Sequence, residues 1–211
     1  MLIFKKITLF LYVWVSTTCF VMAQTSEKNN TYSNSTIDSE IQAYYDIIAS
    51  KFPESQKLKL LIRQRKQLIP LTTVPSVFNL FRKKENWRIT INISNKSIAK
   101  FDPILFKNLS DSAKIGVLGH ELSHAKDFYL HKSKYIVKVF FWHLNPRRID
   151  AFEYNTDKIA IYSGIGDYLK VWSTETHTKM DPMAFNRNEK KDTERYMRPE
   201  TIERIMKESI K

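Results

Sequence analysis

The alternation of apolar and polar residues predicts strands in the first half of the chain. It is regular through "NWRITINISN", residues 86–95, where a tryptophan and three isoleucines occupy every second position, as in a half-buried strand. A weaker alternation predicts another strand over residues 57–65. Residues 38–52 carry apolar side chains at helical spacing instead and end before Pro53, which predicts an amphipathic helix.

Helical periodicity dominates the second half of the chain. The predicted helices have apolar residues three or four positions apart and cover residues 110–128, 132–145, 147–164 and 198–210. The second of them is apolar over most of its length but too short to cross a bilayer, so we expect it to be buried. Residues 173–195 are polar, which predicts an irregular segment. Strands followed by helices, without internal repeats, indicate the α+β class.

The first 23 residues have the organisation of a secretory signal peptide. A short basic start, "MLIFKK", precedes an apolar run that ends in Val21-Met22-Ala23, a small-x-small type of cleavage site. We therefore expect an exported protein, located in the periplasm, the outer envelope or the medium. An uncleaved membrane anchor is the alternative. Residues 24–36 are polar and predict a linker, which leaves residues 37–211 as a single domain.

Cysteine content and charge narrow the classes of partner. The single cysteine, Cys19, lies in the predicted signal peptide, so the mature chain would have no disulfide and no thiolate ligand. The net charge of +12 favours peripheral contact with anionic envelope surfaces. No run of basic and aromatic residues resembles a nucleic-acid-binding module, so we expect no nucleic acid partner. We expect a monomer.

The segment "IGVLGHELSHAKDF", residues 115–128, contains two of the five histidines. His120 and His124 are four positions apart on a predicted helix, so their imidazoles project from one face and can share one zinc ion. Glu121 would lie near the open coordination position, where it can deprotonate a bound water. The spacing therefore predicts one catalytic Zn²⁺. A solvated histidine pair on a helix surface is the alternative.

A zinc ion with an open position needs a third protein ligand. Glu153 lies on another predicted helix, and Asp157 follows one turn later, where its carboxylate can accept the second N–H of a ligand histidine. The alternative third ligands, in place of Glu153, are Asp150, Asp157 and Asp127. Asp127 ranks last, because a continuous helix carries it away from the metal.

The stretch "HELSH" at residues 120–124, followed by Glu153-x-x-x-Asp157, resembles the gluzincin clan of zinc metallopeptidases. The likeness is strongest to the small single-domain members and to the membrane-associated HtpX type, and it covers residues 115–161. "GHELSH" is a common form of the first motif in that clan. The second motif departs from the usual pattern, because Thr156 stands where an alanine normally precedes the aspartate.

The resemblance implies a role for each residue of the two motifs. His120, His124 and Glu153 would be the zinc ligands. Glu121 would be the general base that activates water and later passes its proton to the leaving amine. Asp157 would orient one ligand histidine from outside the coordination sphere. The implied activity is hydrolysis of peptide bonds in a peptide or protein substrate.

The resemblance also implies a zincin-like fold, in which an edge strand above the helical metal site pairs with extended substrate. Thr90–Ser94 is the expected edge strand, because it alternates cleanly and precedes the motif helix. Peptide hydrolysis also needs an oxyanion donor. The sequence candidates share a side chain that can donate a hydrogen bond; they are His177, Tyr168 and His143, together with Tyr162 and Tyr196.

These patterns predict a secreted or periplasmic zinc metallopeptidase, most simply an endopeptidase. A zinc amidase acting on cell-wall peptide is one alternative, although the sequence contains no recognisable wall-binding module. A catalytically inactive zincin-like module, used for binding or envelope assembly, is another; the presence of all five expected site residues speaks against it. Residues 24–56 could serve as a propeptide over the cleft.

Overall fold

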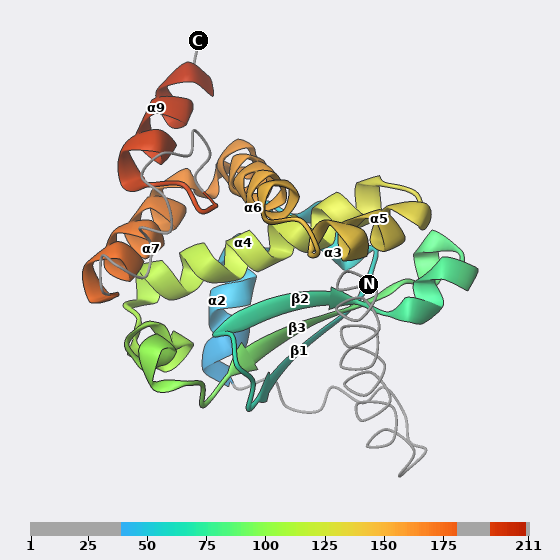
Figure 1. The fold of residues 1–211 in the computed structure, drawn as a ribbon, viewed down its shortest axis with the longest axis horizontal. Coiled ribbons are helices and arrows are strands. Elements are labelled where there is room, and N and C mark those ends of the chain that lie inside the picture. The colour runs from blue at the N-terminus through green and yellow to red at the C-terminus, as the bar shows by residue number, and fades with distance from the viewer. Residues whose placement is uncertain (1–38, 181–194, 210–211) are drawn as a thin grey trace, which may run out of the picture. The chain divides into compact units, whose positions relative to one another are not determined.

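The computed structural model describes residues 39–180 and 195–209, in which a three-stranded sheet packs beside a set of helices (Figure 1). The helices are α2 (Ser39–Ala49), α3 (Pro53–Gln56), α4 (Asp111–Leu130), α5 (Lys134–Trp142), α6 (Pro146–Ala160), α7 (Gly166–Lys179) and α9 (Pro199–Ser209). The strands are β1 (Lys59–Arg65), β2 (Leu71–Pro75) and β3 (Arg88–Ser94). The short connecting helices are η1 (Val77–Phe81), η2 (Lys84–Asn86), η3 (Ala99–Ile104), η4 (Phe106–Asn108) and the π-helical turn η5 (Ile161–Ile165). The predicted α+β class is confirmed.

Helix α4 crosses the centre of the described structure and carries both motif histidines (Figure 1). Its start is capped by Ser110, whose hydroxyl accepts a hydrogen bond from the backbone N–H of Ala113 at 3.3 Å. From Ala113 to Phe128 every residue except Lys126 is buried, because α2, α6, α7 and β2 all contact this helix. The helix therefore buries the polar side chains of the motif, which is costly unless they find partners.

The sheet has the strand order β1-β3-β2. β3 pairs with β1 in parallel and with β2 antiparallel, and its three isoleucines are buried in the core. The strands predicted over residues 57–65 and 86–95 are thus present. The prediction that Thr90–Ser94 is an edge strand was wrong, because β3 is the central strand. Its backbone groups bond to strands on both sides, so they cannot pair with a substrate.

The strand with a free edge next to α4 is β2, which no sequence pattern had identified. Its five residues lie between Pro70 and Ser76 and include Pro75, and proline is unfavourable inside a sheet because it lacks an N–H. An edge strand tolerates proline where no neighbouring strand needs that donor. β2 contacts α4 and lies nearest to it of the three strands (Figure 1).

Hydrogen bonds to β3 show which backbone groups of β2 are free. Ser76, directly after β2, donates its N–H to the carbonyl of Arg88 at 2.9 Å. Backbone bonding alternates along an antiparallel pair, so Thr73 and Pro75 turn their main-chain groups away from β3. The middle of this edge therefore presents the N–H and C=O of Thr73, directly beside the motif helix.

The chain bends sharply between α6 and α7. Gly164, within η5, has a φ of +81°, a conformation that glycine adopts without steric penalty. The bend returns α7 along α4, and at their contact a Cβ atom on Gly116 would lie 2.2 Å from the backbone oxygen of Tyr168. Only glycine permits this approach of the two backbones, which holds α7 against the motif helix.

Two predictions about the helical half were wrong. Residues 173–179 belong to α7 rather than to an irregular segment; residues 181–194 lie outside the described part of the chain. Helix α5 is not a buried helix, because Val139 is its only buried residue and Phe141 is 58% exposed. The apolar run there is thus largely a surface feature.

The predicted signal peptide, residues 1–23, and the predicted linker, residues 24–36, lie outside the described residues. Within residues 39–180 and 195–209, no helix combines the length and the apolar character that crossing a membrane requires.

Candidate metal centre

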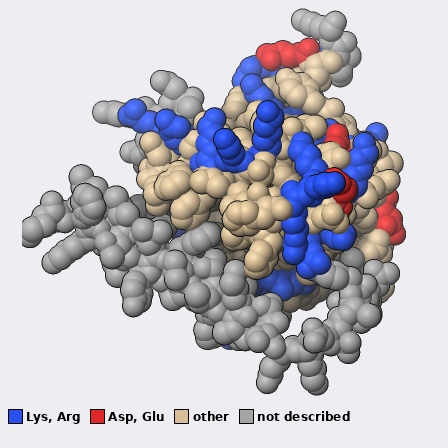
Figure 2. All heavy atoms as spheres, turned by 90° about the vertical axis from the view of Figure 1, so that its right-hand side faces the viewer, with Lys and Arg blue, Asp and Glu red and all other residues tan. Residues whose placement is uncertain are grey.

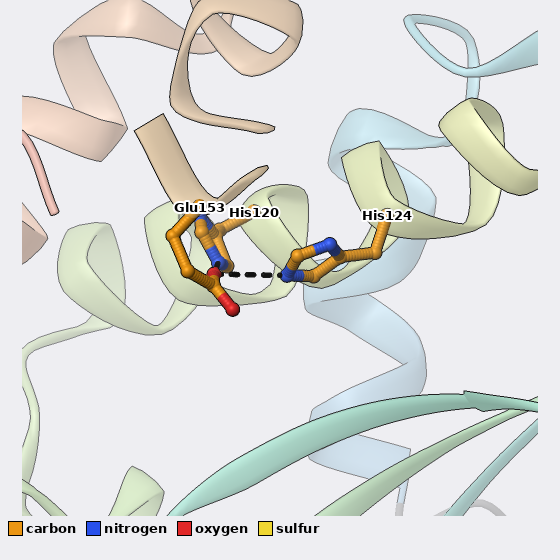
Figure 3. A group of neighbouring side chains, drawn as sticks. All are labelled: His120, His124 and Glu153. Atoms are coloured by element: carbon orange, nitrogen blue, oxygen red, sulfur yellow. Dashed lines mark ion pairs between the residues drawn. The ribbon is translucent and has the colours of Figure 1, made fainter. Parts of the chain in front are cut away.

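Two histidines of α4 and one glutamate of α6 meet at one point (Figure 3). Oε2 of Glu153 lies 3.3 Å from Nε2 of His120 and 3.2 Å from Nε2 of His124. The ligand atoms of the three side chains all lie within 4.8 Å of one another. The structure therefore brings the three predicted ligands together in a largely buried group that could hold a metal ion.

The ring of His120 is oriented by Asp157. Its Nδ1 lies 2.8 Å from Oδ1 of Asp157, and Oδ2 of the same carboxylate accepts the backbone N–H of Met197 at 2.8 Å. An ionised carboxylate only accepts hydrogen bonds, so Nδ1 of His120 carries the imidazole proton. Nε2 is then left with its lone pair directed toward Glu153. This is the relationship predicted for Asp157.

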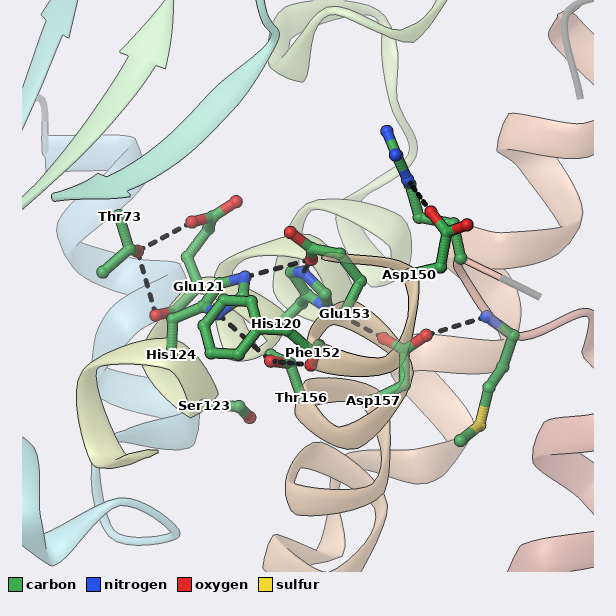
Figure 4. A network of polar contacts seen from close by, with 12 residues as sticks. Thr73, His120, Glu121, Ser123, His124, Asp150, Phe152, Glu153, Thr156 and Asp157 are labelled. Atoms are coloured by element: carbon green, nitrogen blue, oxygen red, sulfur yellow. Dashed lines mark hydrogen bonds and ion pairs between the residues drawn. The ribbon is translucent and has the colours of Figure 1, made fainter. Parts of the chain in front are cut away.

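The ring of His124 is oriented by Thr156. The hydroxyl of Thr156 donates its single hydrogen to the carbonyl oxygen of Phe152 at 3.0 Å. It must therefore accept the hydrogen bond that joins it to Nδ1 of His124 at 3.1 Å. Nδ1 of this histidine is consequently also protonated, and its Nε2 lone pair also faces Glu153 (Figure 4).

Lone pairs of two imidazoles and one carboxylate thus converge. Oε2 of Glu153 is buried and receives no hydrogen bond within the described structure, although two imidazole nitrogens lie within 3.3 Å of it. Such a buried electron-rich group is favourable only when positive charge lies between the atoms. Two histidines and a glutamate also form a common donor set for catalytic zinc, with one coordination position left open. The residues present fit a zinc ion.

The pKa values at this point show the same preference for positive charge. Burial alone would lower the pKa of His120, but the carboxylates of Asp157 and Glu153 outweigh burial and raise it well above its ordinary value. Burial alone would raise the pKa of Glu153, but His124 and His120 hold it well below the usual range. The surroundings therefore stabilise a cation between these groups, whether a proton or a metal ion.

Glu121 is buried beside the ligands and is held by β2. Its Oε2 lies 2.7 Å from the hydroxyl of Thr73, and its backbone carbonyl lies 3.0 Å from the same hydroxyl. The helix thereby places the carboxylate on the side of α4 that faces the free edge of the sheet (Figure 4). A group bound along that edge would lie next to this carboxylate.

Tyr196 packs against one of the candidate ligands, His120. Its ring centre lies 5.7 Å from that of His120 and 5.9 Å from that of Trp172. Both neighbours of Tyr196 in the chain are tied down: Arg195 pairs with Asp150 at 2.6 Å, and the N–H of Met197 donates to the carboxylate that orients His120. The tyrosine is therefore held against His120 although it follows a long segment outside the described residues.

The phenol of Tyr196 keeps its proton. The nearby charge of Glu153, then burial, then Glu121, raise its pKa well above the ordinary value. A neutral phenol is a hydrogen-bond donor. Of the five sequence candidates for the oxyanion donor, Tyr196 is the one that the structure places against a ligand histidine.

The three aspartates considered as alternative ligands have other partners, and those of Asp157 are His120 and Met197. Asp150 forms the ion pair with Arg195. Asp127 accepts a hydrogen bond from the hydroxyl of Tyr135 at 2.7 Å and lies 3.3 Å from the ring of His131. None of the three belongs to the group of neighbouring ligand atoms.

The three oxyanion candidates favoured from the sequence make contacts elsewhere in the structure. The Nδ1 of His143 contacts the carbonyl oxygen of Val139 at the exposed end of α5. His177 lies in the last turn of α7 with its Nδ1 against the carbonyl of Ser173. Tyr168 is packed against the apolar core.

Thr73 and Thr156 are site residues that sequence reasoning did not assign. Thr73 belongs to β2, and the segment "LTTV" between two prolines was too short to identify as a strand. In the sequence, Thr156 stands out only as a departure from a motif. A threonine within a helix can donate its hydroxyl hydrogen to the carbonyl four residues earlier, here that of Phe152. Its oxygen then remains as an acceptor, and this is the signal by which Thr156 could be found.

Comparisons with protein-family models, with curated proteins and with solved structures give no match to this chain.

Proposed function

We propose that this chain is a zinc-dependent peptidase with a zincin-like arrangement of an edge strand above a metal-binding helix. The observation that carries the proposal is the convergence of His120, His124 and Glu153 on one buried point with Glu121 beside it. Structural zinc sites need four protein ligands and no general base. Three ligands with an adjacent carboxylate are the combination that hydrolysis uses.

His120, His124 and Glu153 would hold the zinc ion, with Asp157 and Thr156 fixing the two imidazoles. Bound at that point, zinc supplies Lewis acidity, which polarises a carbonyl and lowers the pKa of water. The protein residues account for the remaining requirements of the reaction. These are a base for the water, a donor for the developing oxyanion and a surface that orients the substrate.

Glu121 acts as the general base. Its carboxylate takes the proton of the attacking water and later delivers it to the amine of the leaving product. The hydroxyl of Thr73 donates to Oε2 of Glu121 at 2.7 Å, which fixes the direction of the carboxylate and leaves Oε1 to receive the proton. Burial of Glu121 keeps bulk water from competing for this contact.

Tyr196 donates a hydrogen bond to the oxygen that becomes negatively charged. Its raised pKa keeps the phenol protonated at neutral pH, and a fixed donor at this place lowers the energy of the transition state more than that of the substrate. The ion pair between Arg195 and Asp150 and the hydrogen bond from Met197 to Asp157 hold this donor in position before substrate binds.

An extended peptide binds along the free edge of β2. The main-chain N–H and C=O of Thr73 provide the hydrogen bonds of an added antiparallel strand. This backbone pairing does not depend on the sequence of the substrate. Because the side chain of the same residue contacts Glu121, a peptide paired at Thr73 has a peptide bond next to the general base.

The experiment that tests the proposal compares zinc content and peptide hydrolysis in the wild-type chain, two site variants and one control variant. We expect one zinc per wild-type chain and hydrolysis of an unstructured protein such as casein. Glu121→Gln should keep the zinc and lose hydrolysis, whereas Glu153→Ala should lose both. Glu203→Gln on α9, which removes a carboxylate in an exposed ion pair, is the matched control and should behave as wild type. A folded wild-type chain that holds no zinc when zinc is supplied would refute the proposal.

A further inference from the structure

A basic and aromatic face lies on the side of the described structure that carries α5, η1 and η2, on the right in Figure 1. The two parts of this face are separate in sequence but share a core cluster, which includes Trp87 after η2 and Val139 of α5. Lys84 of η2 also lies over the ring of Tyr129, at the end of α4, with 5.3 Å between Nζ and the ring centre. The two parts therefore form one continuous side.

Large apolar side chains on this face are exposed to solvent. Phe81, at the end of η1, is 86% exposed, and Phe78 in the same turn is 54% exposed. On α5 and the turn after it, Phe141 is 58% and Leu144 is 48% exposed. A phenylalanine as exposed as Phe81 contributes nothing to the core of its own chain, so its apolar surface is free for another contact.

Positive charge surrounds these apolar residues. Residues 128–149 contain no aspartate or glutamate and include five basic residues, Lys132, Lys134, Lys138, Arg147 and Arg148. η1 is followed directly by Arg82, Lys83 and Lys84. Figure 2 shows this side of the molecule, with many more lysine and arginine than acidic side chains on it.

We propose that this face binds to the surface of an anionic lipid bilayer. Exposed phenylalanine and leucine side chains can enter the boundary between headgroups and acyl chains, while lysines and arginines beside them contact anionic headgroups. On α5 both kinds of residue share the exposed side: Lys134, Lys138 and Phe141 are three or four positions apart. The positive charge of the face attracts it to an anionic bilayer and gives no attraction to a neutral one.

The position of this face relates it to the metal centre. The ring of Trp142 on α5 lies 6.0 Å from that of Phe152, and Phe152 stacks on the ligand His124 at 5.0 Å. Two aromatic side chains thus separate the lipid-facing helix from a ligand of the metal. A chain bound in this way holds its metal centre close to the membrane surface. The binding itself does not depend on the activity proposed above.

A fluorescent label at residue 81 tests the proposal. Cys19 is the only cysteine, so Cys19→Ser with Phe81→Cys gives the full chain one thiol for an environment-sensitive dye. We expect the emission to shift to the blue with vesicles of equal parts phosphatidylglycerol and phosphatidylcholine, and to stay unchanged with phosphatidylcholine alone. The same dye on Thr174→Cys, an exposed position of α7, is the control and should not respond to either.

Charge reversal on α5 provides the second arm. Lys134→Glu with Lys138→Glu should weaken the vesicle response by about 25-fold or more, at roughly fivefold for each lysine charge lost. Arg204→Glu with Lys207→Glu, on exposed positions of α9, should leave it unchanged. An equal shift with both kinds of vesicle would show attachment without charge recognition and would overturn the proposal. A blue shift of the emission that grows with protein concentration in the absence of vesicles would show that the face binds a second copy of the chain. That result would also overturn the proposal.

Discussion

Thr156 accepts the Nδ1–H of His124 while its own hydrogen is donated to Phe152. One hydroxyl thereby decides which nitrogen of this histidine carries the proton. The other ligand histidine obtains the same tautomer from a carboxylate, Asp157. A neutral hydroxyl and a charged carboxylate thus perform the same task at the two imidazoles, and both Nε2 atoms are free to bind a metal.

Thr156→Val should weaken zinc binding. The substitution keeps the volume of the side chain but removes the hydroxyl that accepts from Nδ1 of His124, so this buried N–H loses that partner and the ring its fixed orientation. We expect the dissociation constant for zinc to rise about 10- to 100-fold, measured by competition with a fluorescent chelator. Thr156→Ser keeps the hydroxyl and should bind zinc as the wild type does. Equal affinities for the valine and serine variants would show that the hydroxyl has no part in binding.

Thr73→Val should lower the rate of hydrolysis without changing zinc content. The hydroxyl of Thr73 is the donor that fixes Glu121, and a hydrogen bond to a charged group contributes about 1.5–3 kcal/mol. We expect kcat to fall roughly 10- to 100-fold while KM changes little, since the backbone of the β2 edge is retained. Steady-state kinetics of Thr73→Ser serve as the control, with nearly full activity expected. A change in KM alone would assign Thr73 to substrate binding instead.

Tyr196→Phe should remove the oxyanion donor and leave the ring packing intact. The ring contacts with His120 and Trp172 do not involve the hydroxyl. We expect kcat to fall about 10²- to 10³-fold, with unchanged zinc content and melting temperature. Tyr162→Phe alters a tyrosine that is 66% exposed and provides the comparison, with no expected loss. Full activity of Tyr196→Phe would show that Tyr196 is not the oxyanion donor.

Local sequence patterns were sufficient for the elements that carry the candidate metal ligands. Spacing placed His120 and His124 on one helical face, and a carboxylate one helical turn before Asp157 supplied the third candidate. Both inferences depend on the geometry of a helix, which is the same in every protein. Neither inference therefore requires any knowledge of how the helices pack.

Patterns failed where the structure depends on contacts between distant segments. Regular alternation identified β3 as a strand but cannot say which strand lies at the edge, because strand order follows from packing. The short β2 contains a proline and gave no signal at all. Tyr196 was one of five candidates, and its place over His120 results from hydrogen bonds made by its chain neighbours to Asp150 and Asp157. No local pattern contains that information.

Gly116→Ala should destabilise the fold. The new Cβ would lie 2.2 Å from the backbone oxygen of Tyr168, and a backbone atom cannot move aside as the end of a flexible side chain can. We expect a loss of more than about 3 kcal/mol in the free energy of unfolding, because α7 must shift away from α4. Gly164→Ala tests backbone conformation instead of packing, and should cost roughly 1–2 kcal/mol. Chemical denaturation of both variants measures the difference, and a smaller loss at Gly116 than at Gly164 would contradict the close packing of the helices.

Glu40→Gln should make the stability of the chain less sensitive to acid. Glu40 of α2 lies 2.6 Å from Nζ of Lys114 in α4, and the hydrogen bond from this ammonium group, followed by that from Tyr44, lowers the pKa of Glu40 below its ordinary value. A group with a lowered folded-state pKa contributes stability above its unfolded-state pKa, and that contribution is lost as the pH falls through the folded-state value. The wild type should therefore melt at a higher temperature than Glu40→Gln at pH 7, and the difference should vanish well below pH 4.5, the ordinary value for the group. Melting temperatures measured from pH 7 to pH 3 test this, with Lys114→Met as the background in which the substitution should have a much smaller effect, because only the hydrogen bond from Tyr44 then remains. A difference that persists unchanged to pH 3, or that is equally large without Lys114, would show that the ion pair is not what ties α2 to the motif helix.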